Sequence, residues 1–171
     1  NGEWDDVTYY VSPSPRSRHA SAGKYLFGGQ STSSTTNNQE ILSDTWMCSY
    51  TTTCRIKPCW TKLKQSAQTP PPLYNHAMST FSSGVVLFGG SGKHGVNYND
   101  KIWALDEKQQ IWRPVNPVSS NNPSGRIYHQ MAELGLEGNM MLMFGGNTDS
   151  SHGSVCGTWL LRLTRVVAIG I

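Results

Sequence analysis

Histidines recur at regular positions in this 171-residue sequence, and they are the first side chains to consider for metal or acid–base chemistry. His19, His76 and His129 occupy one equivalent place in three similar segments. Repeats rotate equivalent residues around an axis, whereas zinc sites usually show closely spaced ligands. We therefore predict that these histidines are buried hydrogen-bonding groups of a scaffold, and that the chain binds no metal.

Three further polar side chains lie in segments that follow pairs of glycines. His94 and His152 are in two of these segments, and Asn37 is in the third. Lone histidines in loops are usually solvated, but loops held by a rigid scaffold are also where binding residues concentrate. We predict all three as candidates for contact with a partner.

Arg16 and Arg126 each stand three residues before one of the recurring histidines. A structural interpretation gives them an ion pair or a contact with backbone carbonyls. A functional interpretation makes them anchors for an anionic group on one face of the protein. Both interpretations remain open from the sequence, so both arginines are candidates for partner binding.

Three of the four cysteines are close together in the sequence, at positions 48, 54 and 59. We expect Cys48 and Cys59 on adjacent strands, near enough for a cross-strand disulfide, although Cys54 could pair with either. A zinc site would need paired Cys-x2-4-Cys spacing with a matching second half, which is missing, and Cys156 stands apart. The clustering favours an oxidising, extracellular compartment, with the cytoplasm as the alternative.

A repeat sets the positions of all these groups. Lys24–Gly29, Val85–Gly90 and Met141–Gly146 each end in Phe-Gly-Gly and are 61 and 56 residues apart. The segments between them are short, turn-rich and without sustained 3.6-residue apolar periodicity, which indicates strands. Four short strands per unit, repeated at this period, are typical of propeller blades.

Tryptophans keep the same order as the histidines. One precedes each histidine by 15, 16 or 17 residues, in the pairs Trp4–His19, Trp60–His76 and Trp112–His129. The others are Trp46, Trp103 and Trp159. Because aromatic side chains bury ~150–250 Å² each, regularly spaced tryptophans are expected to pack between blades.

Arg-x-x-His, apolar-Phe-Gly-Gly and a strand tryptophan, in this order over nearly the whole chain, resemble the kelch repeat. The resemblance implies an all-β propeller of four-stranded antiparallel blades. The chain departs from the pattern in its second unit, where Leu73 replaces the arginine. In the first unit, Gly28 comes only nine positions after His19, which predicts an abbreviated first hairpin.

Blade limits follow from the repeat. We predict blades at residues 12–68 and 69–118, a partial blade at 119–163, a tail at 164–171, and in residues 1–11 the fourth strand of a neighbouring or closing blade. Propellers close with about four to eight blades, so the ring is incomplete in this chain. Missing sequence, a partner chain or a second copy in a six-bladed homodimer would complete it.

The kelch resemblance implies a protein–protein interaction module that binds through its loops and is not an enzyme. A metal-dependent enzyme resembling galactose oxidase and a purely structural segment are the alternatives. The net charge of +3 without a dense basic block does not favour a nucleic-acid partner. No apolar run approaches the ~20 residues that cross a membrane. The G-x-G-x-x-G match at Gly90–Gly95 lacks a following helix, so no cofactor is predicted.

Overall fold

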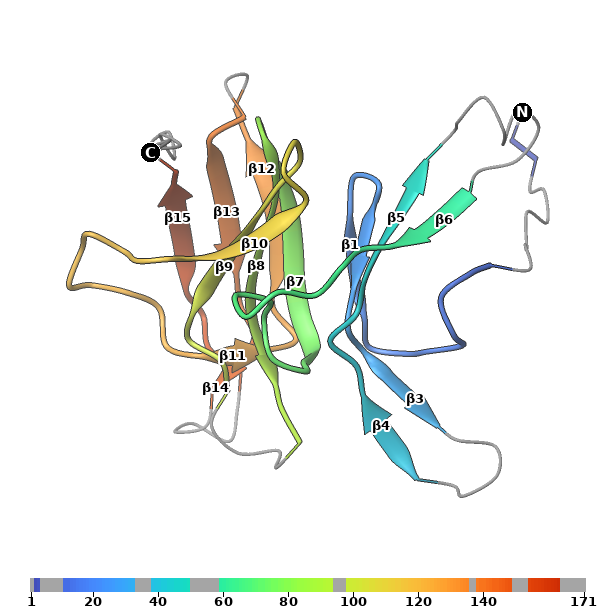
Figure 1. Ribbon diagram of the computed structural model, residues 1–171. Helices are drawn as coiled ribbons and strands as arrows, with labels where there is room; N and C mark the ends of the chain where they lie inside the picture. The colour runs from blue at the N-terminus through green and yellow to red at the C-terminus, as the bar shows by residue number, and fades with distance from the viewer. Residues whose placement is uncertain are drawn as a thin grey trace.

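The computed structural model describes residues 2–3, 11–32, 38–49, 59–93, 98–135, 138–148 and 154–163. Within these ranges the chain consists of short antiparallel strands and turns (Figure 1). No helix in this part of the chain is long and apolar enough to cross a membrane. The predicted all-β class is confirmed.

The first blade is a sheet in the order β1–β2–β5–β6. Its strands are β1 (Ala20–Ala22), β2 (Tyr25–Phe27), β5 (Thr45–Ser49) and β6 (Cys59–Lys62). The turn between β1 and β2 contains Gly23, and each of the two strands has three residues. The predicted abbreviation of the first hairpin is therefore confirmed.

The second blade has the same meander with longer strands, in the order β7–β8–β9–β10. It consists of β7 (Tyr74–Phe81), β8 (Gly84–Ser91), β9 (Ile102–Asp106) and β10 (Ile111–Val115). Every residue of β8 is buried, because this strand has neighbours within its sheet and packs against a blade on each side. The Phe-Gly-Gly motif thus lies at the end of the second strand of its blade.

The third blade has three strands among the described residues: β12 (Gln130–Leu134), β13 (Met140–Phe144) and β15 (Thr158–Arg162). Two small ladders extend from the blades, β3 (Gln30–Thr32) with β4 (Gln39–Ile41), and β11 (Arg126–Ile127) with β14 (Asn147–Thr148). The predicted strand at residues 4–11 lies outside the described residues except for Val11, which is not part of a strand. The predicted blade limits at 12–68, 69–118 and 119–163 stay a prediction, although the three sheets fall within them.

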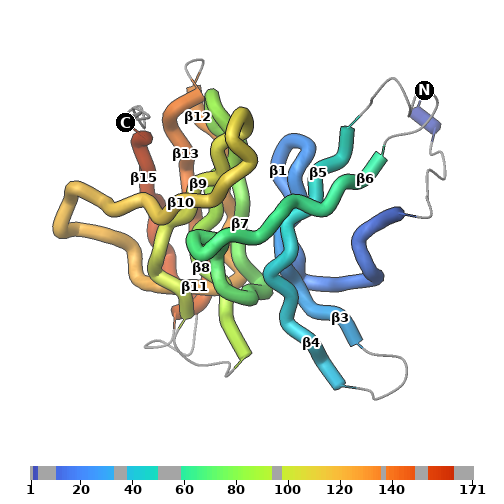
Figure 2. The backbone as a smooth tube through the Cα atoms, viewed as in Figure 1, coloured from blue at the N-terminus to red at the C-terminus, as the bar shows by residue number. Residues whose placement is uncertain are grey.

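The three blades are arranged side by side, with β1, β7 and β12 adjacent where they meet (Figure 2). The core consists of two apolar clusters, one between the first and second blades and one between the second and third. The three sheets do not close on one another, so the predicted incomplete ring is confirmed.

The double glycines allow neighbouring blades to approach closely. Gly28 has φ of +60°, and a Cβ there would lie 2.6 Å from the carbonyl oxygen of Leu73 and 3.2 Å from the His76 ring. Gly89 has φ of +74° and faces His129 in the same way. A side chain at either glycine would clash with the next blade, which explains the recurrence of these glycines.

The predicted Cys48–Cys59 disulfide is wrong. Cys48 pairs with Trp60 and Ser49 pairs with Cys59, so the two cysteines point to opposite faces of the sheet. Cys48 has a free thiol, and burial raises its pKa. Cys54, the alternative partner, lies outside the described residues, while Cys156 is free and exposed.

Candidate partner-binding face

The three loops that follow the double glycines are attached to the blades by the same hydrogen bond. The backbone N–H groups of Leu42, Asn99 and Val155 donate to the carbonyls of Gly29, Gly90 and Gly146, at 2.9, 2.8 and 2.8 Å. The β3–β4 hairpin, the end of β8 and β14 consequently lie at one end of the molecule, the lower end in Figure 1. The repeat therefore brings the bases of three loops to one end of the molecule.

A second repeated feature lies beside these loops, at the start of each innermost strand. The residues immediately before the three histidines, Arg18, Asn75 and Tyr128, have φ of 57°, 57° and 61°. Left-handed backbone is uncommon for residues other than glycine and persists where the surrounding structure determines it. Here the N–H of Asn75 donates to the carbonyl of Arg18 at 3.0 Å, and that of Tyr128 to the carbonyl of Asn75 at 3.3 Å.

Arginine and tyrosine side chains with exposed or half-exposed surface lie in this series or directly beside it. The Arg18 guanidinium lies 5.8 Å from the centre of the Tyr74 ring and donates to Oε1 of Gln30 at 3.1 Å. Tyr128 is 58% exposed. Arginine and tyrosine are enriched among the residues that dominate binding energy at protein interfaces. We call Arg18, Tyr74 and Tyr128 the blade-start cluster.

Arg16, a predicted binding candidate, is buried in an ion pair. Its Nη1 and Nη2 donate to Oδ1 and Oδ2 of Asp44 at 2.6 and 3.0 Å, and Nη1 also donates to the carbonyl of Gly28. The Arg16 side chain is 3% exposed. Burial alone would raise the pKa of Asp44, but hydrogen bonds from Arg16 and Trp46 outweigh it and lower that pKa. These contacts are those of the structural interpretation.

Arg126 donates to backbone carbonyls as Arg16 does, but it forms no ion pair among the described residues. Its Nη1 donates to the carbonyl of Gly145 at 2.9 Å and its Nε to the carbonyl of Ser124. The residue is 3% exposed, and burial lowers the pKa of its guanidinium. Gly157 stands two residues before a strand tryptophan, where the first blade has Asp44. Both arginines therefore hold backbone segments beneath the loops.

The three repeat histidines differ in exposure, and the difference depends on whether a preceding blade covers them. His76 and His129 are buried, and their rings contact Phe27 and Phe88 edge-on at 5.5 and 5.6 Å. Burial lowers their pKa values to about 3 and about 4, so both are neutral at pH 7. His19 is exposed, because no described blade covers the first one. Predicted burial is thus correct for two of the three.

The remaining predicted contact residues, Asn37, His94 and His152, lie outside the described residues. Among the described residues, no three His, Cys, Asp or Glu side chains gather closely enough to hold a metal ion. Sequence reasoning missed the blade-start cluster. The sequence does contain a signal, because the residue directly before the histidine differs from one repeat to the next. Arginine and tyrosine do not favour left-handed backbone, however, so that conformation could not be predicted from them.

A family model described as the KLHDC2/KLHL20/DRC7 Kelch-repeats domain matches residues 1–165. The chain belongs to the Kelch-repeat family. This Kelch-repeat chain is similar to Adagio-like protein 3 of Oryza sativa subsp. japonica, with 33% identity over 141 residues. The match covers 82% of the chain and 20% of that protein. The predicted kelch resemblance is confirmed.

Two further similarities agree with this assignment. Kelch repeat-containing protein 2 of Saccharomyces cerevisiae is 24% identical over 165 residues, covering 87% of the chain and 17% of that protein. The solved structure of YjhT matches with a TM-score of 0.64 and 17% identity, over 91% of the chain and 46% of YjhT. The YjhT match supports the fold. The chain spans about a fifth of the length of the curated relatives named here.

Proposed function

We propose that this Kelch-repeat segment is a protein–protein interaction module that binds its partner with the face formed by the three loops after the double glycines. Kelch-repeat domains commonly serve as interaction modules. The observation that carries the proposal is the repeated hydrogen bond to the second glycine, which fixes the base of each loop at the same level of its blade. Loops on a rigid scaffold are suited to recognition because little backbone order is lost on binding.

The blade-start cluster supplies the chemistry of this face. The exposed Arg18 guanidinium suits a carboxylate, and the ring of Tyr74 offers apolar surface beside it. The exposed Tyr128 lies one blade further along the same backbone series. The partner segment is therefore expected to present an acidic side chain next to an apolar one. Asn37, His94 and His152 are proposed as further contacts from the loops, with Arg16 and Arg126 holding the backbone beneath.

The proposal gives the chain no catalytic residue and no cofactor. Further propeller blades, including those of a second copy, form another class of partner. Such blades would meet the chain at its exposed sheet faces rather than through the loops. The two kinds of contact involve different residues, so they are separable by mutation.

A photo-crosslinking side chain in place of Tyr128 tests the proposed face. It should capture a partner that the same side chain in place of the fully exposed Val118, on the β10–β11 connection, does not capture. For the partner so identified, Arg18→Ala should weaken binding by about 2 kcal/mol, the size of an interface hot spot.

Arg113→Ala, at an exposed arginine on β10, is the matched control and should leave affinity unchanged. Equal losses of affinity for both arginines, or equal crosslinking from both positions, would contradict the proposed face. Unfolding measured by circular dichroism checks that each variant retains the fold.

A further inference from the structure

The first and third blades hold an arginine in the same backbone setting. The Nε atoms of Arg16 and Arg126 each donate to the carbonyl two residues earlier, at 3.0 and 3.2 Å. Their Nη1 atoms donate to the carbonyl of the first glycine of the double glycine, Gly28 at 3.1 Å and Gly145 at 2.9 Å. The two guanidinium groups therefore occupy equivalent places in their blades.

The backbone facing each arginine is also repeated. The N–H of Gly28 donates to the carbonyl of Asp44 at 3.1 Å, and the N–H of Gly145 donates to the carbonyl of Gly157 at 3.2 Å. The strand register agrees, because Asp44 and Gly157 each directly precede the residue that pairs with the motif phenylalanine. Gly157 therefore stands in the place of Asp44 in structure as well as in sequence.

The two places differ in one chemical group, the carboxylate. In the first blade, the carboxylate of Asp44 accepts from Nη1 and Nη2 of Arg16 at 2.6 and 3.0 Å, and from Nε1 of Trp46 at 2.6 Å. In the third blade, Gly157 has no side chain. No Asp or Glu among the described residues pairs with Arg126.

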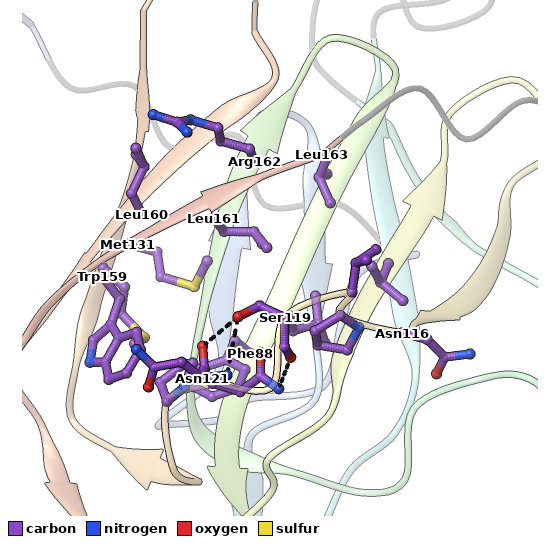
Figure 3. Close-up of a pocket in the computed structure, with 17 residues that line it drawn as sticks. Phe88, Asn116, Ser119, Asn121, Met131, Trp159, Leu160, Leu161, Arg162 and Leu163 are labelled. Atoms are coloured by element: carbon purple, nitrogen blue, oxygen red, sulfur yellow. Dashed lines mark hydrogen bonds between the residues drawn. The ribbon is translucent and has the colours of Figure 1, made fainter.

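The donors of the third blade nevertheless remain around this place. A Cβ at Gly157 would lie 3.0 Å from Nε1 of Trp159 and 3.9 Å from Nη1 of Arg126. Nη2 of Arg126 has no acceptor among the described residues. Figure 3 shows the Trp159 ring beside a cavity of about 530 Å³ between the second and third blades, with the ring nitrogen on the side away from Phe88. The indole N–H is therefore directed toward Gly157 rather than into the cavity.

The second blade shows how the repeat can dispense with this pair. Leu73 replaces the arginine and is 2% exposed, and Lys101 stands where the first blade has Asp44. Replacing both partners of a buried pair by other groups can be nearly neutral, whereas keeping one leaves a buried charge without compensation. The third blade has kept only Arg126, which is 3% exposed. A buried guanidinium in this situation favours an anion from elsewhere.

Such an anion can reach the third blade from solvent. Gly157 and Trp159 are half-buried, and the neighbouring Cys156 and Thr158 are exposed. Asp44, by contrast, is buried in the first blade. The third blade therefore combines a buried charged donor with an approach that the first blade does not need.

We propose that the third blade binds a carboxylate from outside the chain, in the place that Asp44 fills in the first blade, with Arg126 and the indole N–H of Trp159 as its donors. A carboxylate is favoured over other anions because the same arrangement of donors holds one in the first blade, and a guanidinium matches its two oxygens. The group can belong to a free small acid or to an acidic side chain of a bound molecule. The proposal does not depend on the partner-binding face.

An NMR titration with sodium formate at constant ionic strength tests the site. The indole N–H signal of Trp159, assigned by its loss in Trp159→Phe, should shift and saturate. Arg126→Gln should weaken formate binding at least about tenfold, as expected for the loss of a charge-assisted hydrogen bond. Arg113→Gln, at an exposed arginine on β10, is the control and should leave the affinity unchanged.

Gly157→Asp tests the same place without removing either donor. The new carboxylate would occupy the proposed site from within the chain, so formate should no longer shift the Trp159 signal. This variant keeps the proposal testable if Arg126→Gln does not fold. Formate binding that is unchanged in Gly157→Asp would overturn the proposal.

Three further results would also overturn it: no saturable shift of the Trp159 signal, an equal shift with sodium chloride, or formate binding that appears only in an Asp149→Asn variant. The last result would show that the chain supplies the carboxylate itself. Aspartate blocked at both ends, titrated in parallel, distinguishes the sources. Binding of blocked aspartate as tightly as formate would support the site with an acidic side chain as its ligand, and binding of formate alone would support it with a free small acid.

Discussion

The two blade interfaces that the described residues form use the same positions of the repeat, but the second has a cavity where the first has a tryptophan. Between the first and second blades, a phenylalanine, a histidine and a tryptophan meet: Phe27, His76 and Trp112. Between the second and third, Phe88 and His129 meet in the same way, and a cavity replaces the tryptophan. The difference shows that the phenylalanine–histidine contact is made by adjacent blades alone, whereas the tryptophan contact also needs a fourth strand.

Exposure along the repeat follows the same rule. The phenylalanine of the Phe-Gly-Gly motif is buried where the following blade is present and exposed where no described blade follows. Phe27 and Phe144 have the same side chain and the same place in the motif, but different exposures. Sequence equivalence therefore predicts the kind of contact, and the arrangement of blades decides whether it is made.

Removing the tryptophan that completes the first interface should have the largest effect. Trp112→Ala is expected to reduce the free energy of unfolding by about 3–5 kcal/mol, because it leaves a cavity against Phe27 and loses the bond to Thr45. Urea denaturation measures the loss. Trp159→Ala, at a half-buried tryptophan beside the incomplete interface, should cost clearly less. Equal losses from Trp112→Ala and Trp159→Ala would contradict the proposed difference in packing between the two interfaces.

Breaking the buried ion pair of the first blade should have the next largest effect. Arg16→Met leaves the Asp44 carboxylate without its bidentate partner, at an expected cost of about 3 kcal/mol in urea denaturation. The double variant Arg16→Met, Asp44→Leu should lose less than the sum of the two single variants. Additive losses would show that the two side chains act independently.

The two buried histidines should make stability fall with acid. Their folded-state pKa values of about 3 and about 4 lie below the ordinary 6.5, so the unfolded chain binds more protons below pH 6.5. Stability should decrease from pH 6.5 toward pH 4, with a loss of about 2 kcal/mol per histidine at pH 5. Urea midpoints between pH 7.5 and 5 measure the slope. His129→Gln should flatten it, and an unchanged slope would contradict the assignment.

Restoring the missing carboxylate of the third blade should have the smallest effect. Gly157→Asp would give Arg126 and Trp159 the partner that Asp44 provides in the first blade, since a Cβ at Gly157 lies near both. We expect a gain of about 1 kcal/mol in the free energy of unfolding. The gain should vanish in an Arg126→Gln background. A gain in stability that persists in the Arg126→Gln background would show that the new carboxylate does not act through Arg126.

The scaffold was predictable because its signals are local and repeated. Phe-Gly-Gly combines a strand ending with the absence of side chains where the next blade approaches, so Val85–Gly90 was identified as the second strand of a blade. The incomplete ring followed from counting such units. These inferences needed no knowledge of which residues meet across blades.

The site was less predictable, because it depends on register and on neighbouring blades. Cys48 and Cys59 are on adjacent strands as expected, but a one-residue offset puts them on opposite faces. Arg18 and Tyr128 owe their positions to left-handed backbone that their side chains do not signal. His19 has the motif of a buried residue, and its exposure depends on a blade that is not part of the described structure.

The most direct test of this account compares Phe27→Ala with Phe144→Ala at protein concentrations at which sedimentation shows a monomer. Both changes are identical in chemistry and in place within the repeat. We expect a loss of about 3–5 kcal/mol in the free energy of unfolding for Phe27→Ala, and less than about 1 kcal/mol for Phe144→Ala. Equal losses would contradict it, because Phe144 would then be covered in the monomer.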